Sequence, residues 1–127
     1  MNNDEIIEKL KEIKIENYIW LIYIGIIFLS WYSNSLEKDY YMNNNLSSKH
    51  KYQETLIIIF SILAIVYFYF LKSSYNDLKS INSNTSEKKK KLIILSFVSS
   101  LLIFISGILF LYVAITDDNI DVELAFN

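Results

Sequence analysis

The sequence predicts an all-α integral membrane protein, a three-helix bundle that runs up, down and up across a bilayer. Three charge-free windows support this prediction: residues 17–36, 55–71 and 92–116. A membrane-spanning helix needs roughly 20 mostly apolar residues, with about 17 to 25 accepted. The composition agrees, since 53% of the 127 residues are hydrophobic and 16% are aromatic. A soluble helix would keep one polar face, whereas these windows are apolar nearly all round.

The first 16 residues predict a short amphipathic helix on the cytoplasmic side, ahead of the first span. In such a helix Ile6, Ile7, Leu10 and Ile13 fall on one face. The segment carries five carboxylates and three lysines, so we expect an uncleaved anchor rather than a signal peptide. Two hypotheses remain open for this leader: a cap packed against the bundle, or a docking helix for a cytoplasmic partner.

Polar segments separate and follow the spans. Residues 37–54 form the predicted outer loop, residues 72–91 the predicted cytoplasmic loop, and residues 117–127 an acidic outer tail that is expected to stay solvated. Within the cytoplasmic loop, the second helix is expected to continue to about Ser80 and to be followed by a turn. Asn84, with a glutamate three residues later, resembles a capping box that starts the third helix.

The distribution of lysine predicts the orientation of the chain. Nine lysines lie in the leader and the second loop, and three lie in the first loop. Because positive residues stay in the cytoplasm, we expect the N-terminus there and the C-terminus outside. The strongest topology determinants are Lys88, Lys89, Lys90 and Lys91. Binding of these four lysines to anionic lipid is the alternative interpretation.

Small residues on the third span predict a packing face. Ser96, Ser99, Ser100, Ile103, Ser106 and Gly107 gather on one side of that helix. Large apolar side chains are satisfied equally well by lipid tails, so close helix contacts in a bilayer form at small residues. This face has three interpretations: packing against the first two spans, contact with another subunit or copy, or the lining of a pore built by several copies.

The sequence also lacks the residues that most chemistry needs. There is no cysteine, no Asp, Glu, Lys, Arg or His inside any window, and no motif of a hydrolase, zinc protease or nucleotide-binding loop. A net charge of −2 argues against nucleic-acid binding. We therefore expect no enzyme activity, no catalytic residues, no cofactor and no metal. The expected partners are the lipid bilayer and other membrane subunits or further copies of the chain.

Three segments carry a resemblance to known proteins: ENYIWLIY with SWYSN, LSFVSSLLIFISGILFLYVAIT, and DDNIDVELAFN. In these segments the chain resembles a group of small three-span membrane proteins of low-GC Gram-positive bacteria. The resemblance implies a bacterial plasma membrane and three spans, and it implies no activity.

Two function classes follow from these observations. The first is a non-catalytic accessory or scaffold subunit of a membrane complex, supported by the packing face, the amphipathic leader and the lack of catalytic chemistry. The alternative is a self-assembling pore or a membrane-perturbing protein of the holin-like or immunity type.

Overall fold

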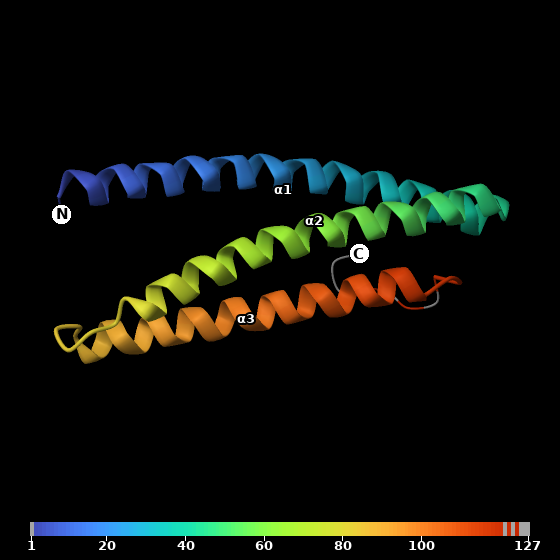
Figure 1. Cartoon of the computed structure of the whole chain (residues 1–127). Coiled ribbons are helices and arrows are strands. Elements are labelled where there is room, and N and C mark those ends of the chain that lie inside the picture. The colour runs from blue at the N-terminus through green and yellow to red at the C-terminus, as the bar shows by residue number, and fades with distance from the viewer. Residues whose placement is uncertain (1, 121, 123, 125–127) are drawn as a thin grey trace.

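The computed structural model describes residues 2–120, 122 and 124, and these form three long helices that alternate in direction (Figure 1). α1 spans Asn3–Asn43, α2 spans Leu46–Lys79 and α3 spans Glu87–Thr116. Each is long and apolar enough to cross a membrane, which confirms the all-α prediction with three membrane-length helices. The start of α1 and the α2–α3 turn lie at one end, called the α2–α3 end below. The α1–α2 turn and the end of α3 lie at the other.

The short N-terminal helix predicted from the sequence is wrong as a separate element. Within the described residues, α1 runs unbroken from Asn3, so the leader forms about its first four turns. The helix begins in a capping box, in which Asn2 Oδ1 accepts the N–H of Glu5 at 2.9 Å and the N–H of Asn2 donates to Glu5 Oε2 at 3.3 Å. Neither proline nor glycine separates the leader from the first span, so nothing ends the helix between them.

The apolar face of the leader stays open in the described part of the chain. Its four side chains are between 42% and 60% exposed: Ile6, Ile7, Leu10 and Ile13. At this end α1 diverges from α2 and α3 (Figure 1). The hypothesis of a cap packed against the bundle is therefore wrong, and that of a docking helix stays a prediction.

Most of the segment predicted as the outer loop is helical. α1 continues to Asn43 and α2 begins at Leu46, so two asparagines make the whole connection. Asn44 has φ 52° and ψ 38°, a left-handed conformation that often ends helices and that asparagine adopts more readily than most residues. Asn45 then caps α2, because its Oδ1 accepts the N–H of Ser47 at 3.1 Å. Hydropathy reports the end of the apolar window but not the end of the helix.

A hydrogen-bonded carboxylate ties these two helices together. Asp39, near the end of α1, accepts hydrogen bonds from the Ser48 hydroxyl on α2, from Asn43 Nδ2 at 2.6 Å and from Asn45 Nδ2 at 2.8 Å. These bonds, with that of Ser48 the strongest, favour the charged carboxylate and hold the pKa of Asp39 below its usual range.

The second turn lies where the sequence predicts it, since α2 ends at Lys79 and α3 begins at Glu87. The N-cap of α3 is Ser86, whose Oγ accepts the N–H of Lys89 at 3.2 Å. The capping box predicted at Asn84 is therefore wrong, because that residue lies within the turn.

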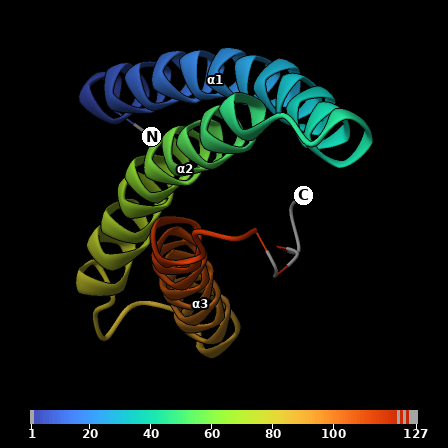
Figure 2. The same cartoon turned by 90° about the vertical axis from the view of Figure 1, so that its right-hand side faces the viewer.

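α2 lies between the other two helices and packs on both. Across the described residues, no Cα of α1 comes within 8 Å of a Cα of α3, and Figure 2 shows the two on different sides of α2. α2 contributes most of the buried side chains, with Ile59 and Phe60 at 0% and 1% exposure. The three helices therefore form an open, curved layer rather than a closed bundle. Helices that are apolar nearly all round can leave a face to lipid, so packing does not force closure.

The chain after α3 turns back toward the helices. The N–H of Val122 donates to Asp117 Oδ2 at 2.9 Å. Leu124 is only 6% exposed and belongs to the same buried cluster as Ile26 and Leu36 of α1. The prediction that the tail stays solvated is therefore wrong at Leu124. Residues 121, 123 and 125–127 of that tail lie outside the described residues.

Replacing Asp39 with asparagine should destabilise the fold at neutral pH. The amide has one acceptor oxygen instead of two, and its NH2 group would face the donors that now bond to the carboxylate. A lowered folded-state pKa means that this contribution is complete above the unfolded-state pKa of about 4, and is lost as the pH falls through the folded-state value. The difference in melting temperature between wild type and Asp39→Asn should thus shrink in acid. Circular dichroism of the protein in mild detergent measures it.

Glu54→Gln is the control for this experiment, since Glu54 is exposed near the same turn. It should leave the melting temperature at neutral pH unchanged. If Asp39→Asn proves as stable as wild type at neutral pH, the carboxylate does not hold the turn.

Candidate functional site

The residues predicted as a packing face on α3 do not all meet the same neighbours. Two of them contact α2. Ser100 Oγ lies 2.8 Å from Ser74 Oγ in a hydrogen bond, and Gly107 is buried against the ring of Tyr67.

The other four residues are more open. Ser96, Ile103 and Ser106 line hollows beside the contact with α2. Ser99 is exposed, lines none of the hollows found between the described helices, and donates its Oγ hydrogen to Leu95 O at 2.8 Å. Helical spacing alone places all six on one side, but it does not say which of them the neighbouring helix reaches.

A groove runs along the open side of the layer, with α2 as its floor and α1 and α3 as its walls. We call it the inter-helix groove, and its volume is about 420 Å³. Its lining residues come from all three helices: Tyr23, Tyr67, Phe70, Ser73, Ser74, Asp77, Ser96, Ser100 and Ile103.

Two further hollows adjoin the inter-helix groove. One of about 350 Å³ shares Tyr67 and Ile103 with it and follows α2 and α3. The other, of about 270 Å³, shares Tyr23 and Phe70 with it and follows α1 toward Glu16. The three together give an open depression along the layer.

Polar side chains line the part of the groove nearest the α2–α3 end. Ser73, Ser74 and Asp77 come from α2, and Ser96 and Ser100 come from α3. In a bilayer, small and polar side chains are typical of helix–helix contacts rather than of lipid-facing surfaces. The lining therefore has the composition of a helix-packing surface.

The register between α2 and α3 explains why these polar groups meet. The rings of Tyr75 and Phe97 lie 6.2 Å apart, and Ser74 bonds to Ser100. The charged end of α2 after Lys72 thus runs beside the charge-free stretch of α3.

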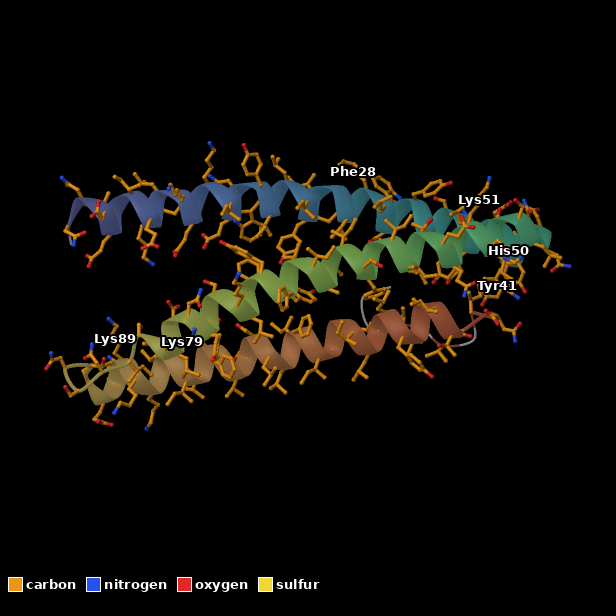
Figure 3. The ribbon with its side chains drawn as sticks, viewed as in Figure 1. Phe28, Tyr41, His50, Lys51, Lys79 and Lys89 are labelled. Carbon is orange, nitrogen blue, oxygen red and sulfur yellow. The ribbon has the colours of Figure 1, made fainter. Side chains whose placement is uncertain are left out.

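Charge is divided between the helices at the α2–α3 end. Residues 2–16 of the α1 side carry five carboxylates and three lysines, whereas residues 72–91 carry six lysines and two carboxylates. Figure 3 shows Lys79 and Lys89 at this end. Two ion pairs occur among the described residues, Lys9–Glu12 and Lys90–Glu87, each at 3.6 Å and each within one helix. The basic segment is therefore not neutralised by α1.

The four predicted topology determinants form most of the first turn of α3. Lys88, Lys89, Lys90 and Lys91 directly follow Glu87, the first residue of the helix. Their role in orienting the chain stays a prediction.

The sequence did not single out the α1 and α2 residues of the groove. Tyr23, Tyr67 and Phe70 read as ordinary apolar or interfacial side chains, and Ser73, Ser74 and Asp77 read as loop residues. The one signal in the sequence for these groove residues was the pair of small polar side chains, Ser73 and Ser74, just after the second window. Within the described residues, no three histidine, aspartate or glutamate side chains lie close enough together to hold a metal ion.

No protein-family model, no curated protein and no solved structure matches this chain. Its class follows from the structure instead, since three helices can each span a membrane. The chain is a small multi-pass membrane protein whose apolar helices contact the lipid bilayer. The resemblance drawn from the sequence is supported as far as three spans, and no family is identified.

A large residue at Gly107 should destabilise the contact between α2 and α3. A Cβ placed there would lie 2.9 Å from Tyr67 Cδ2, closer than packed atoms allow. Overpacking of this kind costs about 1–3 kcal/mol, so Gly107→Leu should lower the unfolding free energy by that amount. Denaturant titration in bicelles measures it.

Gly25→Leu is the matched control on α1. A Cβ at Gly25 meets nothing within 4 Å in the described structure, and leucine is a better helix former than glycine. This variant should be as stable as wild type or more stable. Equal destabilisation by the two substitutions would show that the Tyr67 contact is not the cause.

Proposed function

We propose that the chain is a non-catalytic scaffold subunit of a membrane complex, located in a bacterial plasma membrane with its N-terminus and residues 72–91 in the cytoplasm. The observation that carries this proposal is the inter-helix groove. It lies open between α1 and α3 and takes lining residues from all three helices.

The chemistry of the lining supports a helix as the occupant. Lipid tails satisfy large apolar side chains as well as protein does, but they offer no partner to the hydroxyl of Ser96, which lies in the third charge-free window. A helix that inserts between α1 and α3 can pack against the aromatic floor and hydrogen-bond to Ser96. Its cytoplasmic end can reach Ser73 and Asp77. Such a helix would contact both α1 and α3, which do not contact each other in the described structure.

The composition of the lining also supports a non-catalytic role. Within the described residues, the titratable side chains of the inter-helix groove are Asp77, Tyr23 and Tyr67, and its lining includes no histidine or lysine. General acid–base catalysis needs titratable groups within hydrogen-bond reach of one another, and no hydrogen bond joins any two of these three side chains in the described part of the chain.

Ser96→Phe should weaken the complex, because the larger side chain occupies the groove that the partner helix needs. We expect the fraction of chain in the large complex to fall about tenfold or more, which corresponds to roughly 1.4 kcal/mol. The measurement is the mass of the intact complex after the tagged chain is extracted from its native membrane in mild detergent.

Val98→Phe is the matched control, two residues away on α3. Val98 is exposed and lines none of the hollows among the described residues, and residues two apart do not share a helix face. This variant should keep the wild-type complex. A wild-type particle that contains a single 15.0 kDa chain would refute the scaffold function.

A self-assembling pore or membrane-perturbing protein, holin-like or immunity-type, is the alternative function. The observation that favours it is Ser99, which is exposed outside the groove and would face the lumen of a pore built from several copies. Induced expression should then depolarise cells, and Ser99→Leu should abolish that effect. If the chain is a scaffold, a voltage-sensitive dye should report a normal membrane potential in cells that express wild type and in cells that express Ser99→Leu.

A further inference from the structure

The outward face of the start of α3 holds a second hollow region, separate from the inter-helix groove. Its volume is about 530 Å³, and its lining is Glu87, Lys88, Lys90, Lys91, Ile94 and Leu95. The lining thus passes from ammonium groups to apolar side chains within about two turns. Such a boundary matches the boundary between headgroup and acyl chain in a lipid.

The lysines of this hollow are available to an anion. Lys90 pairs with Glu87 at 3.6 Å, but no carboxylate lies within ion-pair distance of Lys88 or Lys91 among the described residues. Both are exposed. They lie three residues apart, which places them side by side on the helix surface.

An exposed row of leucines continues from these lysines along the same face of α3. Leu95, Leu102 and Leu109 follow at seven-residue spacing and are 55%, 59% and 59% exposed. The hydrogen bond between Ser74 and Ser100 places Lys72 of α2 at about the level of Leu102. The apolar residues of α3 next to the headgroup level are therefore Ile94 and Leu95, which line the hollow together with the lysines.

We propose that this surface binds an anionic phospholipid, with the phosphate on Lys88 and Lys91 and the first part of an acyl chain along Ile94 and Leu95. The net positive charge of residues 72–91, six lysines against two carboxylates, selects an anionic headgroup over a zwitterionic one. The first turn of α3 adds free backbone N–H groups that favour an anion at the same place. The proposal does not depend on the scaffold function.

The test uses the purified full-length chain in detergent micelles, where the lysines no longer decide topology. Phosphatidylglycerol is titrated into the sample, and binding is measured by native mass spectrometry and by the rise in melting temperature. The double variant Lys88→Gln, Lys91→Gln should bind phosphatidylglycerol about 30-fold more weakly, the equivalent of roughly 1 kcal/mol per lysine. Phosphatidylcholine should bind weakly to both chains.

Two control variants distinguish binding at this site from non-specific electrostatic attraction between lysines and an anionic lipid. Lys11→Gln, Lys14→Gln removes the same charge from exposed positions of α1 at the same end and should bind phosphatidylglycerol like wild type. Lys88→Arg, Lys91→Arg keeps the charge and should also bind it. Equal losses in the α1 and α3 double variants would overturn the site. Equal stabilisation by inorganic phosphate would overturn the lipid as its ligand.

Discussion

The position of α2 between the other two helices determines the rest of the structure. Its side chains meet α1 on one face and α3 on another, and the inter-helix groove exists because those two helices do not meet. The contact with α3 is held by groups that lipid cannot replace. Ser74 bonds to Ser100, Tyr67 covers Gly107, and Gln53 Nε2 donates to Ala114 O at 3.2 Å. The last of these satisfies a carbonyl at the end of α3, where the helix itself offers no donor.

Hydropathy predicted three helices of membrane-spanning length correctly, because burial in lipid selects long runs of apolar side chains. It could not predict where the helices end. Polar residues before Asn17 and after Leu36 continue α1 as exposed helix, and only Asn44 breaks it. The sequence could not predict that α2 lies between the other two helices, because a helix that is apolar all round does not show which of its faces is buried. On α3, the spacing of small residues located Ser100 and Gly107, both of which contact α2. It also grouped Ser99 with them, although among the described residues that side chain bonds only to its own helix.

The two ends of the space between α1 and α3 differ in what fills them. Toward the α1–α2 end, Leu124 from the chain after α3 joins Ile26 and Leu36 in the buried cluster. Toward the α2–α3 end, within the described residues, the groove stays open and its lining turns polar at Ser73 and Asp77. An apolar side chain can fill the first end because its surroundings are apolar. The second end is polar, and the partner helix that we propose would bring hydrogen-bonding groups to it.

The four lysines at the start of α3 are poorly placed for the helix alone, since positive charge at an N-terminus opposes the helix dipole. Ser86 and Glu87 offset part of that cost by capping and by pairing with Lys90. An anionic headgroup would offset the rest, because phosphate at a helix N-terminus is favoured by both the backbone N–H groups and the lysines. The proposed orientation and the proposed lipid binding would then have one cause, because the lysines predicted to keep this end of α3 out of the bilayer core are the groups that would hold the phosphates at its surface.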